Sequence, residues 1–340
     1  MGAKESIDII RDSSEEIISE DELTDLLEQD ENPVAYEGFE PSGLAHIAFG
    51  LYRPLIIQEH IDAGIDFKIL LADYMAEKNG RLDGDPAKIR ESGEYFVEVL
   101  EASELDLDDV DILWQSDIVE DPEYWNIATE VATNHSLNRA ERTLPKEDRN
   151  HAKNPFDTFY PSMQCADMFY LDADISQMAM DQRKVNMLAR EVAPRIDRDK
   201  PVAIHGKFLP SLSGPEHKMD KSISGTSIYV HDSSEEIEEK IHSAYCPPAK
   251  SDNNPILEYA EEIIFRANDE LFIPREQKYG GDLLVESYEE LGDVYVSGGL
   301  HPEDLKKGVS KSLDELISPI RSHFNQSESA EELYENVLNH

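Results

Sequence analysis

Short apolar runs alternate with helix-like segments along the first part of the chain. The runs Pro33–Tyr36, Phe67–Ala72 (FKILLA) and Asp111–Trp114 (DILW) have the length of buried strands. Between them, Ile47–Ala63 carries apolar residues at helical spacing, and Ile89–Leu105 is also predicted to be helical. This strand–helix–strand–helix order predicts a parallel sheet with crossover helices.

The remaining segments predict more helix than strand. The expected helices are residues 14–32, 118–162 and Asp181–Val192, and the expected short strands are Pro201–His205 and Ser227–Val230. Ser233 or Ser234 can cap a helix, with Glu236 reaching back in a capping box. After Pro247 and Pro248 the pattern is mostly helical. An α/β part is therefore expected to precede a helical part, with the boundary near residues 225–250.

The charge balance changes what such a fold is expected to bind. The 340 residues include 31 Lys and Arg against 73 Asp and Glu, a net charge of −42, and 39% hydrophobic residues suffice for a packed core. This acidity argues at first against a nucleic-acid partner. The acidic residues are spread along the chain, which favours a solvating surface for a salt-rich cytoplasm over a basic partner. Residues 139–221, however, hold 14 Lys and Arg against 13 Asp and Glu, so a polyanion can approach this segment.

Several classes of protein are excluded by simple features. No window approaches 18 apolar residues, so no transmembrane helix is expected. The N-terminus lacks the apolar stretch of a secretory signal. Cys165 and Cys246 are far apart, so neither a disulfide framework nor a zinc site is indicated. We expect a cytoplasmic protein without a membrane association, a protein-bound metal or an organic cofactor.

Two segments contain side chains suited to binding phosphate. His46 follows the turn that joins the first strand to its helix, which is where α/β sheets bind anions. Lys218 and Lys221 lie three residues apart in a Ser- and Gly-containing loop and could neutralise a leaving pyrophosphate. Taken singly, each has a structural alternative, since His46 could simply begin a helix and the lysines could lie in a solvated loop.

Two further segments predict a small amphiphilic ligand. If residues 161–169 are helical, Gln164 and Asp167 share a face, with Tyr160 one turn earlier. A phenol, an amide and a carboxylate would suit a ligand that carries both an amine and a hydroxyl. Gln182 could join this pocket, and the adjacent Arg183 and Lys184 could face phosphate. The alternatives are a capped helix with satisfied buried polar groups and an ordinary helix terminus.

In their order along the chain, these segments resemble class I aminoacyl-tRNA synthetases of the archaeal and eukaryotic tyrosyl type. The resemblance covers about residues 6–324 and consists of YEGFEPSG, FKILLAD, YPSMQCAD, MDQRK, KMDKS, HDSSEEIEEKIHSAYCP, NPILEY, KYGGDL and LHPEDLK. It implies a Rossmann-like parallel-sheet catalytic domain with a helical insertion, followed by an α-helical anticodon-binding domain. The implied boundaries are 1–32 for the N-terminal lead-in, 33–228 for the catalytic domain with its insertion at about 118–160, and 229–340 for the C-terminal domain.

The resemblance also implies a reaction and its residues. ATP, accompanied by Mg²⁺, activates tyrosine to tyrosyl-adenylate and pyrophosphate, and the tyrosyl group then moves to the 3′ end of tRNA(Tyr). The implied catalytic residues are His46, Lys218 and Lys221. The implied tyrosine-binding residues are Tyr36, Tyr160, Gln164, Asp167 and Gln182. The implied ATP-binding residues are Gly38, Glu40, His46, Ala179, Lys218, Met219, Lys221 and Ser222.

The implied macromolecular contacts are a tRNA and a second copy of the chain. The implied tRNA-binding residues are Arg139, Arg142, Arg183, Lys184, His301 and Asp304. In the family the insertion around residues 118–160 forms a dimer interface, so a homodimer is expected. Asp304 is the candidate acceptor for an anticodon base edge, although His301–Asp304 is also a good helix N-terminus.

Three positions depart from the family pattern. The first signature is His46-Ile47-Ala48-Phe49 where His-Ile-Gly-His is common, Asp220 stands where Ser is usual, and Ala179 stands where Gly is usual. A carboxylate beside a triphosphate is unfavourable, and an added methyl could crowd the adenylate. A paralogue without aminoacylation activity is therefore one alternative. A tryptophanyl-tRNA synthetase, the nearest class I relative, is the other, although the pair Tyr36 and Asp167 argues against it because an indole ring has no hydroxyl.

Overall fold

The computed structural model describes residues 2–29, 32–103, 105–144, 154–214 and 227–340. The chain forms two compact units, each assembled from three segments. Unit 1 comprises Met1–Ser42, Ile57–Gly93 and Asp106–Phe208, and unit 2 comprises Gly43–Ile56, Glu94–Leu105 and Leu209–His340. The linear domain boundaries expected at residues 33 and 229 stay predictions.

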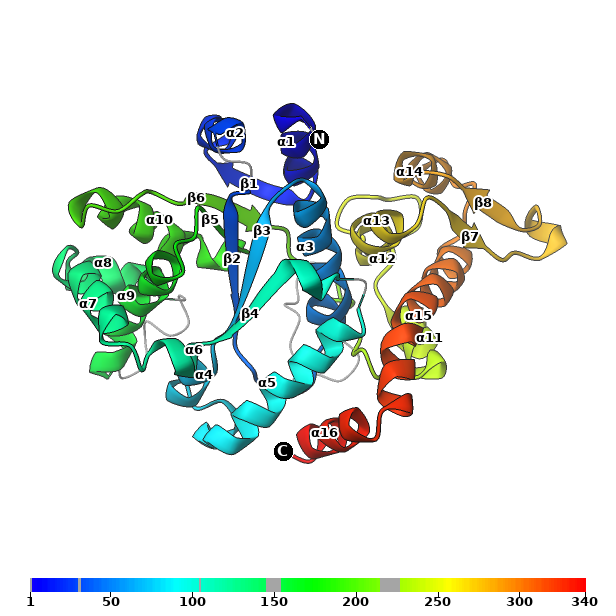
Figure 1. Cartoon of the computed structure of the whole chain (residues 1–340). Coiled ribbons are helices and arrows are strands. Elements are labelled where there is room, and N and C mark those ends of the chain that lie inside the picture. The colour runs from blue at the N-terminus through cyan, green and yellow to red at the C-terminus, as the bar shows by residue number, and fades with distance from the viewer. Residues whose placement is uncertain (1, 30–31, 104, 145–153, 215–226) are drawn as a thin grey trace. The chain divides into compact units, whose positions relative to one another are not determined.

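Unit 1 is built on a six-stranded sheet with the order β1-β6-β5-β2-β3-β4 (Figure 1). The strands are β1 Ser14–Ile18, β2 Val34–Phe39, β3 Asp66–Leu71, β4 Val110–Trp114, β5 Ile175–Ala179 and β6 Val202–Gly206. β2 to β6 run parallel, and only the edge strand β1 is antiparallel to its neighbour. The expected α/β class with a parallel, Rossmann-like sheet is confirmed, as are the four strands predicted within this unit. β5 was not predicted.

The expected helix over residues 14–32 is wrong in its first part. Ser14–Ile18 is strand β1, in which Ile17 and Ile18 pair with Ile204 and Ala203 of β6. Pairing with the edge of the sheet satisfies the backbone of this segment, and this tertiary contact outweighs its local preference. The helical part is α2, Glu20–Gln29, preceded by α1, Ala3–Asp12.

The helices of unit 1 include α4 Asp73–Lys78, α6 Gln115–Ile118, α7 Pro122–Thr133, α8 Leu137–Thr143, α9 Pro155–Tyr170 and α10 Arg183–Val192. The predicted helical character of residues 118–162 and 181–192 is confirmed for these parts, and residues 145–153 lie outside the described residues. The helices α7, α8, α9 and α10 gather at one side of the sheet (Figure 1). Their buried faces share one apolar core with sheet residues, represented by Leu70, Val131, Met163 and Leu188. Helices α3, Arg53–Asp62, and α5, Pro86–Glu101, each contain residues of both units.

The strand order positions the candidate site. Strand β2 lies between β5 and β3, and the chain winds outward in opposite directions from the β2–β5 pair. Open α/β sheets bind ligands outside the carboxyl ends of the strands at such a switch point. Glu40 follows the end of β2, and the 3₁₀ turn Met180–Gln182 follows the end of β5. Residues after these two strands therefore belong to one end of the sheet.

Unit 2 is mainly helical, as expected for the C-terminal part. Its elements are the π-turn η1 Ala48–Tyr52, α11 Ser234–Ser243, α12 Pro255–Tyr259, the π-turn η7 Ala260–Ile264, α13 Phe265–Ala267, β7 Leu271–Ile273, the 3₁₀ turn η8 Gln277–Tyr279, β8 Leu283–Val285, α14 Tyr288–Val296, α15 Pro302–Gln326 and α16 Glu328–Leu338. The antiparallel β7–β8 hairpin was not predicted. The strand expected at Ser227–Val230 is wrong, because only Tyr229 forms a bridge there, with His46.

The predicted capping box is confirmed at the start of α11: Ser233 caps the helix, and Glu236 reaches back to the backbone of Ser233.

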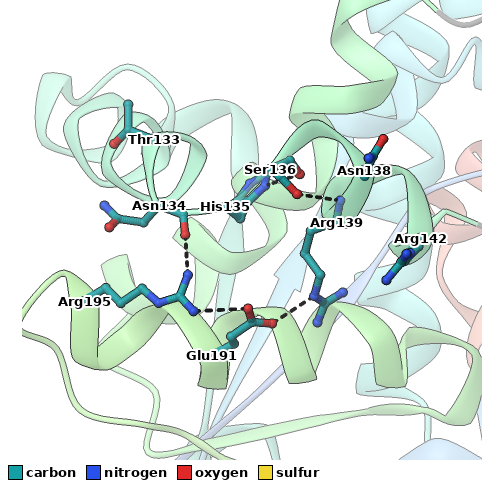
Figure 2. Close-up of a pocket in the computed structure, with 9 residues that line it drawn as sticks. All are labelled: Thr133, Asn134, His135, Ser136, Asn138, Arg139, Arg142, Glu191 and Arg195. Carbon is teal, nitrogen blue, oxygen red and sulfur yellow. Dashed lines mark hydrogen bonds and ion pairs between the residues drawn. The ribbon is translucent and has the colours of Figure 1, made fainter.

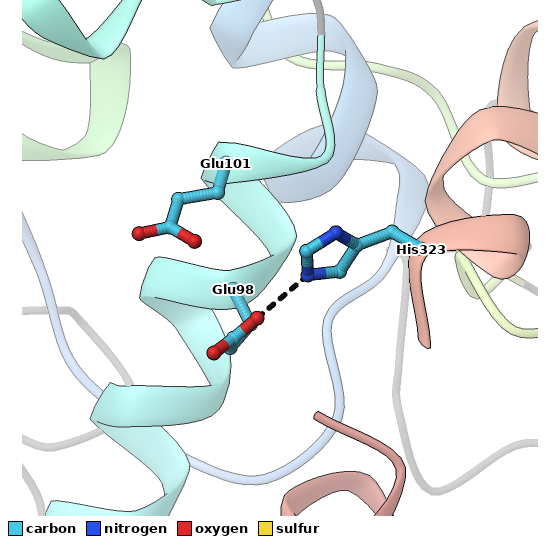
Figure 3. Close-up of side chains that lie close together, drawn as sticks. All are labelled: Glu98, Glu101 and His323. Carbon is cyan, nitrogen blue, oxygen red and sulfur yellow. Dashed lines mark hydrogen bonds and ion pairs between the residues drawn. The ribbon is translucent and has the colours of Figure 1, made fainter. Parts of the chain in front are cut away.

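The long helix α15 makes a polar contact with α5 within unit 2. The Nε2 atom of His323 on α15 lies 2.6 Å from an Oε2 of Glu98 on α5, beside Glu101 (Figure 3). No helix in the described ranges is long and apolar enough to cross a membrane.

Candidate functional site

A buried carboxylate, Asp167 on α9, is the centre of a polar cluster in unit 1. Its side chain is 2% exposed. The Nε2 of Gln115 donates to both carboxylate oxygens at 3.1 Å, and the hydroxyl of Tyr124 donates to Oδ1 at 2.8 Å. Gln115 directly follows strand β4, and Tyr124 lies on α7. Three separate elements thus meet at this carboxylate.

Burial and hydrogen bonding act in opposite directions on Asp167. Burial disfavours the charged form and raises the pKa of this carboxyl to about 7. Hydrogen bonds from Gln115, Tyr124 and Tyr36 favour the charged form and limit the rise in pKa. The pKa of Asp167 near neutrality is therefore the balance between burial, which raises it, and the donors, which lower it.

Tyr36 on strand β2 is the third donor to Asp167. It is 2% exposed, and burial, followed by the nearby Asp167, raises the pKa of its phenol well above the ordinary value. The phenol therefore remains protonated and can donate. A Cβ atom added at Gly38 would lie 2.8 Å from the Tyr36 hydroxyl oxygen, so the missing side chain at Gly38 makes room for this phenol.

The second part of the cluster is more open and is built around Gln164 and Glu40. The Nε2 of Gln164 donates to the Oε1 of Gln182 at 3.3 Å. The Oε1 of Gln164 is buried and accepts no hydrogen bond from any described residue. Glu40, after β2, accepts from the hydroxyl of Tyr160 at 3.3 Å and from the Nε of Arg81 at 3.0 Å. A carboxylate and an unpaired amide oxygen suit a ligand with an amine.

The structure brings together most of the residues predicted for the small-molecule pocket. Tyr36 and Tyr160 interact with Asp167, Gln164 hydrogen-bonds to Gln182, and all five residues belong to unit 1. The predicted i, i+3 relation of Gln164 and Asp167 is confirmed, since both lie in α9.

Sequence reasoning missed Gln115 and Tyr124. A polar residue directly after an apolar strand in a parallel sheet is a recognisable signal, and it could have pointed to Gln115. The local sequence around Tyr124 carries no comparable signal.

The phosphate-binding candidates belong to other segments of the chain. His46 belongs to unit 2, where its Nδ1 accepts from the backbone N–H of Ala48 at 3.2 Å. When the ring is neutral, the proton is therefore on Nε2, which can donate to an oxygen. Lys218, Met219, Lys221 and Ser222, together with Asp220, lie outside the described residues.

Ala179 ends strand β5 without backbone strain. Its φ of −70° and ψ of 159° are extended values that any L residue adopts. The substitution of the usual glycine therefore requires no unfavourable conformation.

Three arginines line an open pocket between α7, α8 and α10 (Figure 2). Arg139 donates from Nε to Glu191 at 2.9 Å, and Arg195 donates to Glu191 at 3.3 Å and to the carbonyl of Asn134 at 2.7 Å. Arg142 lies on the same rim (Figure 2). With one carboxylate among three guanidinium groups, the pocket is positively charged in a strongly negative chain.

Several of the other residues predicted to bind tRNA make contacts within the chain. Arg183 makes a bidentate contact with Glu16 at 2.6 and 2.9 Å, and Lys184 follows it on α10. His301 caps α15 through Nδ1, which accepts from the backbone N–H of Glu303 at 3.2 Å. Asp304 is 8% exposed and lies 3.7 Å from the Nζ of Lys307.

Comparisons with known proteins identify relatives over the whole chain. A family model described as tRNA synthetases class I (W and Y) matches residues 28–318. The chain is 40% identical over 334 residues to tyrosine–tRNA ligase 1, cytoplasmic, of Arabidopsis thaliana, covering 97% of this chain and 87% of the relative. It is 37% identical to tyrosine–tRNA ligase of Sulfolobus acidocaldarius, covering 99% and 98%.

Solved structures show the same similarity. Tyrosyl-tRNA synthetase from Aeropyrum pernix aligns with a TM-score of 0.90 at 36% identity, covering 99% of each chain. Tyrosyl-tRNA synthetase from Archaeoglobus fulgidus, solved with L-tyrosine, aligns with a TM-score of 0.87 at 34% identity, covering 94% of this chain and 99% of that one.

Proposed function

The chain belongs to the class I tRNA synthetases for tryptophan and tyrosine, and from this premise we propose how it acts as a tyrosine–tRNA ligase. Its family and its function as an aminoacyl-tRNA ligase rest on full-length relatives that are tyrosine–tRNA ligases. The observation that carries the choice of tyrosine is the buried pair of Tyr36 and Asp167. The indole of tryptophan has no hydroxyl for this pair.

The reaction requires positioning more than covalent chemistry by the protein. The carboxylate of tyrosine attacks the α-phosphorus of ATP, a P–O bond forms, and the bond to pyrophosphate breaks. The adenylate then transfers its tyrosyl group to a ribose hydroxyl at the 3′ end of tRNA, releasing AMP. No protein nucleophile takes part, so the enzyme contributes orientation and stabilisation of charge.

The tyrosine pocket is assigned to the cluster in unit 1. Tyr36 and Asp167 bind the substrate phenol, and Tyr160, Gln164 and Gln182 surround its amine. The buried, unpaired Oε1 of Gln164 supports this, because an ammonium group would supply the missing donor. A site built to pair a hydroxyl rejects the analogue that lacks it, since its own buried groups are then left unpaired, and tyrosyl-tRNA synthetases are themselves the standard example of this rule.

ATP is assigned to residues at the ends of β2 and β5 and in the two signature segments. Gly38, Glu40 and Ala179 would contact the nucleotide, and the Nε2–H of His46 would donate to phosphate. Lys218 and Lys221, with Met219 and Ser222, would stabilise the departing pyrophosphate. Mg²⁺ would enter as part of the ATP complex and neutralise phosphate charge.

We assign this metal to the phosphates of ATP and not to protein side chains. The metal-ligand cluster found in the described part of the chain is Glu98, Glu101 and His323. Two of these three groups already form the ion pair between α5 and α15.

The positive pocket supports a contact with tRNA. Arg139 and Arg142 lie in it, and Arg183 and Lys184 begin helix α10, which also carries Glu191 of the pocket. At the start of α15, His301 is exposed and would contact the anticodon with Asp304. A homodimer, a cytoplasmic location and adaptation to high salt complete the proposal, and the last is supported by the net charge of −42.

Binding of free amino acids by the variant Tyr36→Phe tests the proposal. Without the phenol donor, the affinity for tyrosine should fall at least tenfold and that for phenylalanine should stay the same or improve. Tyr170→Phe is a matched control, because the Tyr170 hydroxyl on the same helix as Asp167 donates instead to Asp121. Equal losses for both amino acids would contradict the assigned pocket.

A further inference from the structure

Two buried residues, Gln115 and Tyr124, contact Asp167 without facing the amine-binding part of the pocket. Both are fully buried, and they reach the carboxylate from α6 and α7. The roles assigned above leave both side chains unexplained. Burying an amide and a phenol is costly unless their hydrogen bonds are used, so their presence requires a reason.

The orientation of Gln115 is determined by its second contact. Its Oε1 accepts from the backbone N–H of Met75 at 3.0 Å. The NH₂ group therefore has to face Asp167, where it lies 3.1 Å from each oxygen. Because it bridges both oxygens, it restricts rotation of the carboxylate about its terminal bond.

Tyr124 supplies a second fixed donor. Its hydroxyl lies 2.8 Å from Oδ1 of Asp167 and 3.3 Å from the carbonyl oxygen of Met163. A hydroxyl has one proton, and the nearer, charged acceptor is the better partner. The ring is held by edge contacts with Trp125 and Tyr170, whose centroids lie 5.6 and 5.8 Å away.

The donors leave capacity for one more. A carboxylate has about four lone-pair positions. The hydrogen bonds from Gln115 to both oxygens and from Tyr124 to Oδ1 occupy three of these positions. The fourth can accept one hydroxyl proton, which is that of Tyr36 in the free chain and that of the substrate phenol when tyrosine binds.

We propose that Tyr124 and Gln115 are positioning residues that determine specificity for the substrate hydroxyl, because they fix the Asp167 carboxylate and favour its ionised form. Ionised Asp167 can only accept a hydrogen bond, which matches a phenol donor and penalises phenylalanine. This inference rests on the proposed function, and it adds two residues that the family resemblance did not supply.

Among the titratable groups that face one another here, Asp167 is the one with a pKa near neutrality. Facing it are Tyr36, Tyr124, Tyr160 and Cys165, and burial raises the pKa of each of them above its ordinary value. None of them ionises near pH 7, whereas the pKa of Asp167 is raised to about 7. A change in tyrosine binding with a midpoint near neutral pH would therefore report Asp167.

The test is the pH dependence of tyrosine binding by wild type and Tyr124→Phe, measured by equilibrium dialysis without ATP from pH 5.5 to 9 at constant KCl. Loss of one hydrogen bond to a charged group raises the pKa of Asp167 by roughly one unit or more. The midpoint of the acid limb should therefore move up by about one pH unit. Near pH 7 tyrosine should bind about fivefold more weakly, with a deficit that approaches tenfold at lower pH and becomes small above pH 8, while phenylalanine binding changes less than about twofold.

The control variant and the shape of the pH profile distinguish a positioning role of Tyr124 from a purely structural one. Tyr170→Phe removes a hydroxyl from the neighbouring ring and should leave the midpoint unchanged. A uniform loss at every pH, or an unmoved midpoint in Tyr124→Phe, would overturn the inference while leaving the proposed function intact. Failure of the wild type to bind tyrosine would overturn both. If Tyr124→Phe does not fold, Gln115→Met removes the other donor and should shift the midpoint in the same direction.

Discussion

Substituting Gly38 by alanine should disable the tyrosine pocket through a single steric contact. The added Cβ would lie 2.8 Å from the Tyr36 hydroxyl oxygen and 3.5 Å from the phenol carbon that carries it. Ordinary contacts at this type of atom begin at about 3.4 Å, so the hydroxyl would have to move by roughly half an ångström. Since the phenol is buried and hydrogen-bonded to Asp167, it has little room to adjust.

The size of the effect follows from what the displaced phenol loses. Overpacking a well-packed site costs about 1–3 kcal/mol of stability. A hydrogen bond to a charged group contributes about 1.5–3 kcal/mol, which corresponds to roughly a 10- to 100-fold change in an equilibrium constant. We therefore expect the KM for tyrosine in ATP–pyrophosphate exchange to rise at least tenfold and the KM for ATP to change less than about threefold.

A double-mutant cycle isolates this contact. In a Tyr36→Phe background the hydroxyl is absent, so Gly38→Ala should destabilise the fold much less than it does in the wild type. The coupling measured from unfolding free energies should be about 1 kcal/mol or more. Additive effects of the two substitutions, or a rise in the KM for ATP with an unchanged KM for tyrosine, would refute the steric argument and indicate that Gly38 acts mainly at the nucleotide.

Three further predictions concern other parts of the molecule. Asp167→Ala should reduce the preference for tyrosine over phenylalanine more than the rate of exchange, and Lys221→Ala should do the reverse; equal effects would contradict these roles. Burial lowers the pKa of His231 from 6.5 to about 4, so the folded chain favours the neutral imidazole. The stability from this preference is fully present above pH 6.5 and is lost as the pH falls from 6.5 toward 4, and it amounts to about 3 kcal/mol at most. His231→Phe should flatten that part of the unfolding free energy against pH in chemical denaturation, and an unchanged slope would count against it. tRNA affinity should depend weakly on KCl because few counterions are released, and a steep fall between moderate and molar KCl would be the opposite result.

The sequence predicted the sheet where local pattern and burial agree. The runs that became β2, β3, β4 and β6 are short, apolar and bounded by polar residues; β2, β3 and β6 are largely buried in the sheet, and the edge strand β4 is mostly half-buried. Ser14–Ile18 and Ile175–Ala179 escaped for different reasons. The first is an acidic segment that becomes a strand only by pairing with β6, and the second continues into a turn and a helix without a clear break.

The residues assigned to substrate contact could be predicted from the sequence, whereas the residues that hold Asp167 in place could not. The order of the motifs indicated Tyr36 and Asp167, because these residue types at these places match a known family. Gln115 and Tyr124 could not be assigned from spacing, since 43 or more residues separate them from the carboxylate that they contact. The role of Gly38 also depends on the folded structure, because the atom nearest to an added Cβ there is the hydroxyl oxygen of Tyr36, two residues earlier on the same strand.

The central claim is that a buried phenol–carboxylate pair selects tyrosine for activation by ATP. It is tested most directly by ATP–pyrophosphate exchange with the purified chain in high KCl, supplied with each amino acid in turn. The account predicts exchange with tyrosine and no exchange above background with phenylalanine or tryptophan. Exchange with tryptophan, or no exchange with any amino acid, would contradict it.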